Sequence, residues 1–115
     1  VVTLERIPEL ARRARELLAE LGYGGVIVKV GDGTLGYAEM APYDRILVAA
    51  GGPRIPEALL EQLADGGTLV MPVGERDVQT LTRVTRHGEA YREESLCRCV
   101  FVPLVGRQGH SEGVA

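Results

Sequence analysis

Short apolar runs, most of them bounded by glycine or proline, most constrain what this chain can fold into. They occupy residues 1–4, 26–30, 44–50 and 68–73 and are rich in valine, isoleucine and leucine. Runs of this length are too short for helices, and their mostly apolar character is typical of parallel strands covered on both faces. We therefore predict four buried strands.

Helical segments separate these strands. After the first strand, apolar residues recur at helical spacing, with Pro8 in the first turn and Gly22 at the end, which predicts a helix over residues 8–21. Residues 56–63 predict a short amphipathic helix that the turn at residues 65–67 ends. Strands that alternate with helices predict an α/β fold with a mostly parallel sheet.

The last third of the chain has a different pattern. Residues 78–85 alternate between polar and apolar, Gly88 predicts a turn, and residues 95–104 alternate again. This pattern favours an antiparallel pair of strands that closes one edge of the sheet. We expect the polar residues 106–115 to be frayed.

Metal binding is disfavoured. The chain has two cysteines, Cys97 and Cys99, and two distant histidines, His87 and His110. These four residues lack the spacing of a metal site, so we predict no metal and expect both thiols to pack as apolar side chains.

Composition and charge narrow the classes of partner. The chain has 115 residues, which favours one domain, and 13 basic against 16 acidic side chains give a formal charge of −3. Such a chain has no electrostatic footprint for a phosphate backbone, so we expect no nucleic-acid partner. No apolar stretch approaches the roughly 18 residues that span a bilayer, and the N-terminus has no leader pattern. We expect a soluble, cytoplasmic protein without a membrane partner.

Candidate binding residues lie at the ends of the predicted strands, where open parallel sheets bind ligands. Glu5 follows the first strand, and its carboxylate can accept hydrogen bonds from two vicinal ribose hydroxyls. Asp32 follows the second strand between Gly31 and Gly33, which lets its backbone approach a ligand. Residues 49–53 follow the third strand with small side chains only, so these positions together predict a nucleoside-like cleft.

Each candidate also has a structural interpretation. A single acidic residue at a strand end is more often solvated or placed at a helix N-terminus. Gly-Asp-Gly is most often a turn, and small residues after a strand usually reflect helix packing. Taken one at a time, these residues do not identify a function.

Several short motifs follow one another in a fixed order: Glu5-Arg6, Gly31-Asp32-Gly33, Ala41-Pro42-Tyr43-Asp44, Pro53-x-x-Pro56, Pro72-Val73-Gly74 and Phe101-Val102-Pro103-Leu104. The first two are shared by many methyltransferases that use S-adenosylmethionine. The combination closely resembles the protein-L-isoaspartate O-methyltransferase family, to about Gly106.

The resemblance implies a Rossmann-like class I methyltransferase fold, present in part, and a protein-repair activity. Members of that family transfer a methyl group from S-adenosylmethionine to the free α-carboxylate of L-isoaspartyl residues in damaged proteins. By the same resemblance, Glu5 holds the ribose hydroxyls and Asp32 with Gly33 lines the adenine. On the substrate side, Ala50 and Pro53 border the methyl-transfer site.

The resemblance also places Val105 where the family brings its C-terminal segment over the substrate. Family members carry a further N-terminal part, with the active-site Ser or Thr, the first strand and the Gly-rich cofactor loop, that has no counterpart here. No catalytic residue can therefore be assigned. We expect residues 1–115 to be the C-terminal part of a single methyltransferase domain, either as a fragment or with the first half on another chain.

A second class of function stays open. The chain could be a non-catalytic α/β remnant that uses its open strand edges for association, because unpaired edges invite pairing. This alternative predicts no cofactor binding. The sequence assigns no oligomeric state.

Overall fold

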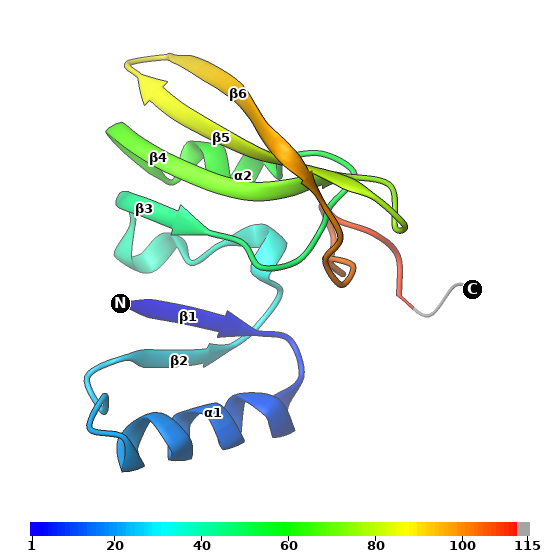
Figure 1. Cartoon of the computed structure of the whole chain (residues 1–115). Coiled ribbons are helices and arrows are strands. Elements are labelled where there is room, and N and C mark those ends of the chain that lie inside the picture. Colours follow the sequence, from blue (N-terminus) through cyan, green and yellow to red (C-terminus); the bar gives the residue numbers. More distant parts are fainter. Residues whose placement is uncertain (113–115) are drawn as a thin grey trace. The chain divides into compact units, whose positions relative to one another are not determined.

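The computed structural model describes residues 1–112 and divides them into two compact units, Val1–Gly33 and the part from Thr34 onward. Each unit contains strands paired in parallel (Figure 1). The expectation of frayed ends at 113–115 lies outside the described residues. Among residues 1–112, no helix is long and apolar enough to cross a bilayer.

The first unit is a β-α-β arrangement. Strand β1 (Val2–Glu5) pairs in parallel with β2 (Ile27–Val30), and helix α1 (Pro8–Glu20) connects them. Pro8 stands in the first turn of α1, where its missing N–H costs nothing, and Gly22 follows the helix with a positive φ of 87°. The strands and the helix follow the sequence prediction to within about one residue at each end.

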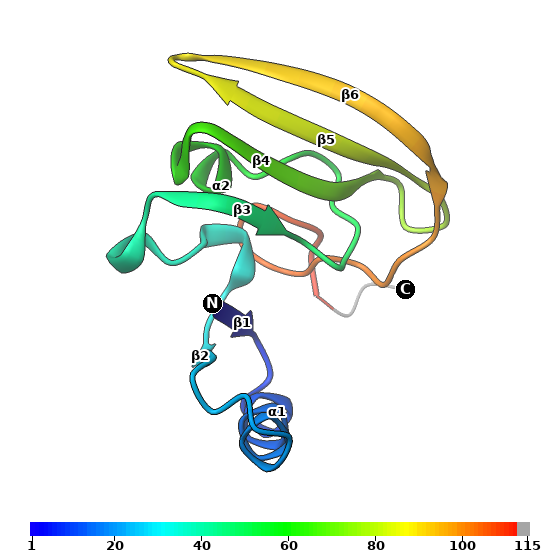
Figure 2. The same ribbon diagram turned by 60° about the vertical axis from the view of Figure 1, so that its left-hand side comes forward.

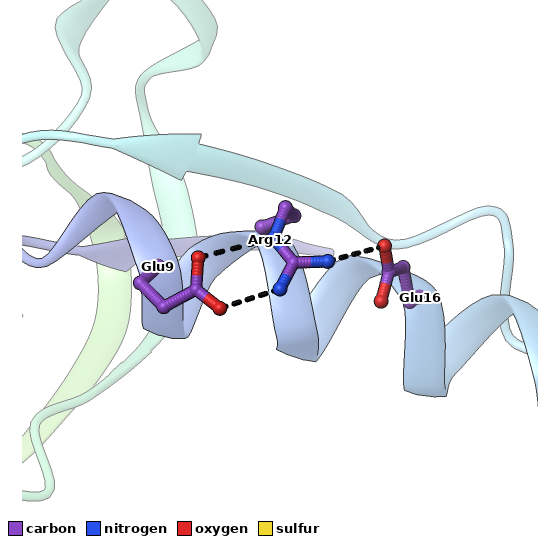
Figure 3. Close-up of polar contacts among 3 residues, drawn as sticks. All are labelled: Glu9, Arg12 and Glu16. Carbon is purple, nitrogen blue, oxygen red and sulfur yellow. Dashed lines mark hydrogen bonds and ion pairs between the residues drawn. The ribbon is translucent and has the colours of Figure 1, made fainter.

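The buried face of α1 packs on the strand pair, and its polar face is exposed. Ala11 is fully buried, and the Arg15 guanidinium donates to the Val28 carbonyl at 2.8 Å. On the exposed face, Arg12 bridges Glu9 and Glu16 one turn away on either side (Figure 3). The hydrogen bonds that Arg12 donates to Glu9 and Glu16 raise the pKa of Arg12.

The second unit is a four-stranded sheet in the order β3-β4-β5-β6 (Figure 2). Strand β3 (Tyr43–Leu47) is parallel to β4 (Leu63–Gly74), whereas β5 (Gln79–His87) and β6 (Ala90–Cys99) add antiparallel strands. The antiparallel pair confirms the pattern of the last third of the sequence. Helix α2 (Glu57–Glu61) packs on β4 and joins the core of Leu59, Leu63, Leu69, Met71 and Val84.

Two strands are more exposed than the sequence predicts. Val30 in β2 is 51% exposed and Leu47 in β3 is 81% exposed, so the expectation of strands covered on both faces is wrong for β2 and β3 within residues 1–112. Among those residues, β1 and β2 pair only with each other and β3 pairs only with β4. An apolar run shows that a strand favours burial, but the neighbouring elements decide whether it is buried.

The expected helix over residues 56–63 is shorter, because β4 starts earlier than predicted. The Tyr43 amide donates to the Gln62 carbonyl at 2.8 Å, and Tyr43 pairs with Leu63. The register then shifts before Arg45 pairs with Thr68, so the predicted turn at residues 65–67 is a bulge inside β4. Gly66 supports the bulge with a φ of 79°.

The loop between β2 and β3 contains two short 3-10 helices that the sequence did not predict, η1 (Gly33–Leu35) and η2 (Ala38–Met40). Gln62 holds this loop: its Oε1 accepts from the Tyr37 amide at 2.9 Å, and its Nε2 donates to the Leu35 carbonyl at 3.0 Å. Side-chain contacts between distant residues therefore order a segment whose sequence has no helical periodicity.

The C-terminal part leaves the sheet earlier than the alternation over residues 95–104 predicts. Strand β6 ends at Cys99, and the following residues cross to the loop after β3, where Pro103 pairs with Gly51. The chain then turns back on itself, and Val105 pairs with His110. The expectation of a frayed segment is therefore wrong for residues 106–110.

Candidate functional site

In the first unit, the carboxyl ends of β1 and β2 bring the predicted cofactor residues together. Glu5 pairs with Val30, and the Gly31 amide donates to the Glu5 carbonyl at 3.0 Å. Asp32 and Gly33 follow directly along the chain. The parallel register therefore places the Glu5 carboxylate at the same edge as the Gly-Asp-Gly turn, as the strand-end argument predicts.

The Glu5 carboxylate has a structural role in the unit. Its Oε1 accepts from the Ile7 amide at 3.1 Å, and Ile7 is the N-cap residue of α1. This contact satisfies one of the amides that a helix start leaves without an intrahelical partner. A carboxylate can accept about four hydrogen bonds, so Glu5, which is half-buried, retains acceptor capacity for hydroxyl groups.

The glycines beside Asp32 are not required by contacts within the chain. A Cβ placed on Gly31 or on Gly33 would meet no described atom within 4 Å. Neither residue has the positive φ that glycine alone adopts readily. The space beside both positions is open, which fits a backbone that a bound molecule approaches closely.

In the second unit, the small residues after β3 lie between two other segments. The Gly52 amide donates to the Pro72 carbonyl at 3.1 Å, and Gly52 forms a parallel bridge with Val73. This bridge continues the parallel pairing of β3 and β4. On the other side, the Gly51 amide donates to the Val102 carbonyl at 2.7 Å, and the Leu104 amide donates to the Gly51 carbonyl at 2.8 Å. Residues 51–52 are thus a short central strand.

The predicted substrate-side residues gather around this short strand. Ala50 directly precedes it and Pro53 follows it, while Val105 directly follows the segment that pairs with Gly51. Pro53 also lines an open groove of about 320 Å³, which it shares with Arg54, Tyr91 and other side chains of the sheet. Glu5, Asp32 and Gly33 belong to the first unit, and these three residues belong to the second.

The cysteines do not behave as expected. Cys97 is exposed and Cys99 is half-buried, and both thiols are free. The expectation of apolar packing is wrong for Cys97, because β6 is the edge strand of the sheet and most of its side chains are exposed. Among residues 1–112, no group of three or more histidine, cysteine or acidic side chains could hold a metal ion.

Two phenols with shifted pKa values lie close together: Tyr37 in the loop between β2 and β3, and Tyr43 at the start of β3. The Tyr37 hydroxyl donates to Glu39 at 2.9 Å, and this hydrogen bond raises the pKa of Tyr37. Burial, together with the charge of Glu39, raises the pKa of Tyr43, whose hydroxyl donates to the Tyr37 carbonyl. Both phenols stay protonated at neutral pH, so they serve as hydrogen-bond donors in this loop.

Gln79 was not found by the sequence analysis. It begins β5, is 2% exposed, and has its side-chain amide bonded to backbone groups of two different segments. The sequence shows only a glutamine near the start of an alternating strand, and its burial is known from the structure alone. Its partners, however, lie up to 22 residues away in the sequence.

Solved structures define the class of this fold. A protein-L-isoaspartate O-methyltransferase aligns with a TM-score of 0.85 and 27% identity, covering 95% of this chain and 35% of its own. A second structure, from Plasmodium falciparum and in complex with S-adenosyl-L-homocysteine, aligns with a TM-score of 0.79 and 24% identity, covering 91% of this chain and 52% of its own. The chain has part of the Rossmann-like class I methyltransferase fold, which confirms the predicted fold class.

Sequence comparisons give the family. The family model for protein-L-isoaspartate(D-aspartate) O-methyltransferase matches residues 1–109. The protein-L-isoaspartate O-methyltransferase of Syntrophotalea carbinolica is 55% identical over 98% of this chain and 53% of its own length. The chain belongs to the protein-L-isoaspartate(D-aspartate) O-methyltransferase family, as its motifs indicate. It spans about half the length of the curated relatives it matches.

Proposed function

We propose that this chain is the C-terminal part of a single methyltransferase domain that methylates the α-carboxylate of L-isoaspartyl residues in damaged proteins. The family match over residues 1–109 carries the proposal. The substrates are isoaspartyl-containing peptides and proteins, and the methyl donor is S-adenosylmethionine. We place the protein in the cytoplasm, a compartment in which its free thiols stay reduced.

The cofactor's adenosine end is assigned to the first unit. Glu5 would accept hydrogen bonds from the ribose hydroxyls while it keeps its contact with the Ile7 amide. Asp32 and Gly33 would line the adenine, and the open space beside Gly33 supports this assignment. S-adenosylmethionine supplies, when bound, a methyl group on a positively charged sulfur.

The substrate side is assigned to the second unit. Ala50 and Pro53 would border the methyl-transfer site and Val105 would contact the substrate. The pairing of Gly51 with Val102 and Leu104, which places Val105 directly after the paired segment, supports the grouping. Methyl transfer to a carboxylate depends mostly on alignment and desolvation of the attacking oxygen. These residues would therefore orient the peptide and exclude water.

The remaining parts of the domain are assigned to a longer protein that contains this chain. Two observations support this: the matched relatives are about twice as long, and within residues 1–112 β1 and β3 each pair on one side only. An unpaired strand edge exposes backbone donors and acceptors that a further strand can satisfy. The catalytic residue is assigned to that further part.

Methyl transfer to paired peptides tests the proposal. The complete protein is incubated with labelled S-adenosylmethionine and either an isoaspartyl peptide or the same peptide with normal aspartate. We expect a base-labile methyl ester on the isoaspartyl peptide only. Equal labelling of both peptides, or of neither, contradicts the proposal. Absence of labelling together with absence of S-adenosylhomocysteine binding favours the alternative, a non-catalytic α/β remnant that associates through its strand edges.

A further inference from the structure

We infer that Gln79 is a positioning residue for the substrate side: its side-chain amide fixes residues 101–105, termed here the crossing segment, beside Gly51. The inference rests on the proposed function, because it assigns Val105 at the end of that segment to the substrate. The crossing segment follows β6 and returns to the loop after β3 (Figure 1).

The Gln79 amide joins two segments through three hydrogen bonds. Its Nε2 donates to the Glu75 carbonyl at 2.7 Å and to the Arg76 carbonyl at 3.3 Å. Its Oε1 accepts from the Phe101 amide at 2.7 Å. The side chain is 2% exposed, so water does not readily replace these partners. One buried amide therefore connects the β4–β5 turn to the first residue of the crossing segment.

Gly51 is in direct contact with the same side chain. A Cβ on Gly51 would lie 2.7 Å from Cδ and 2.8 Å from Cγ of Gln79, closer than such atoms can approach. Gly51 also exchanges backbone hydrogen bonds with Val102 and Leu104. Gln79 thus contacts both strands of this pairing, Gly51 through packing and Phe101 through a hydrogen bond.

Only an amide of this length satisfies all three backbone groups. Glutamate could still accept from Phe101, but its second oxygen would face the carbonyls of Glu75 and Arg76 without a proton to donate. Methionine fills a similar volume and offers neither a strong donor nor a strong acceptor. Either replacement leaves buried backbone groups without partners, which loosens the turn, the crossing segment or both.

The start of the crossing segment needs such an anchor because its side chains are largely exposed, whereas Leu104 further along packs against the core. Phe101 is 38% exposed and Val102 is 69% exposed. Pro103 has no amide proton, which leaves the segment one backbone donor fewer. The position of Phe101 and Val102 therefore depends on the hydrogen bonds to Gln79 and Gly51. A shift of about 1 Å at the substrate side is enough to slow a reaction that depends on alignment.

The test compares Gln79→Met with Thr82→Val in the complete protein. Thr82 is a matched control because it lies in the same strand, is 6% exposed, and donates one hydrogen bond to the Thr80 carbonyl at 3.0 Å. We expect Gln79→Met to raise KM for an isoaspartyl peptide at least about tenfold while KM for S-adenosylmethionine changes less than about twofold. Thr82→Val should leave both KM values near those of the wild type.

Hydrogen exchange provides a readout that does not require activity. We expect faster exchange of the Phe101 and Leu104 amides in Gln79→Met, and no such change in Thr82→Val. An unchanged peptide KM in Gln79→Met overturns the inference, as do equal changes in both variants. If the wild-type protein methylates no isoaspartyl peptide, the proposed function fails, and unchanged Phe101 exchange in Gln79→Met then separately overturns the anchoring role.

Discussion

Glu5 combines a structural contact with the proposed cofactor contact in one carboxylate. Its Oε1 accepts from the Ile7 amide at the start of α1, and its backbone carbonyl accepts from Gly31. The sequence is compatible with both a structural and a functional interpretation of Glu5, and the structure shows that the structural contact exists. The spare acceptor capacity of a carboxylate allows both roles at once.

Replacing Glu5 tests the functional role. We expect Glu5→Ala in the complete protein to weaken S-adenosylhomocysteine binding by about 1–3 kcal/mol, the usual range for hydrogen bonds to a charged group. Isothermal calorimetry measures the change. Glu9→Ala is the control, because Glu9 is an exposed acid that pairs with Arg12 on α1. Unchanged affinity in Glu5→Ala removes Glu5 from the site.

Gly51 tests the packing around Gln79. We expect Gly51→Ala to lower the free energy of unfolding by about 1–3 kcal/mol, because the added Cβ would overlap the Gln79 side chain. Urea unfolding measures this loss. Gly25→Ala is the control: a Cβ there meets no described atom within 4 Å, so its effect should stay within about 0.5 kcal/mol. Equal losses in the two variants would show that Gly51 is not sterically constrained.

At the scale of elements, periodicity predicted the type of each main helix and strand but not always its length. The α1 prediction holds because its apolar spacing, Pro8 and Gly22 all agree. The helix predicted over residues 56–63 is too long because Leu63 pairs with Tyr43 and belongs to β4. These two residues are 20 apart in sequence. Local sequence carries no signal for such a partner.

The β5–β6 hairpin carries a pH-dependent ion pair across its strands. The Arg83 guanidinium donates to Glu94 at 2.8 Å, and this hydrogen bond lowers the pKa of Glu94 in the folded protein. A carboxylate with a lowered folded pKa stabilises the fold above its unfolded pKa. This contribution is lost as the pH falls through the folded pKa, in the acidic range.

Removing that carboxylate should therefore reduce the acid sensitivity of the hairpin. We expect Glu94→Gln to flatten the fall of the urea midpoint between about pH 6 and about pH 3 relative to the wild type. Glu93→Gln is the matched control, because Glu93 is the adjacent acid on β6 and makes no ion pair among residues 1–112. A control that flattens the curve equally would contradict the assignment to Arg83 and Glu94.

At the scale of the whole molecule, S-adenosylhomocysteine binding should show whether the complete protein has a cofactor site. A ligand that binds only the folded state stabilises it by about 2.7 kcal/mol at a concentration of 100 times Kd. We expect S-adenosylhomocysteine to raise the Tm of the complete protein and to raise it less in Glu5→Ala at the same concentration. Differential scanning fluorimetry measures both shifts. An unchanged Tm in the complete protein would favour the non-catalytic α/β remnant.

The sequence by itself determined the α/β class, the order of the main elements, the positions of Glu5, Asp32 and Gly33 at strand ends, and the family. These properties follow from local spacing, capping residues and motif order, all of which can be read from the sequence. Only the tertiary structure revealed the bulge in β4, the return of residues 101–104 to Gly51, and the hydrogen bonds of Gln79 to two distant segments. Each of these depends on backbone partners distant in sequence, and hydrogen bonds across such distances leave no periodic pattern to find.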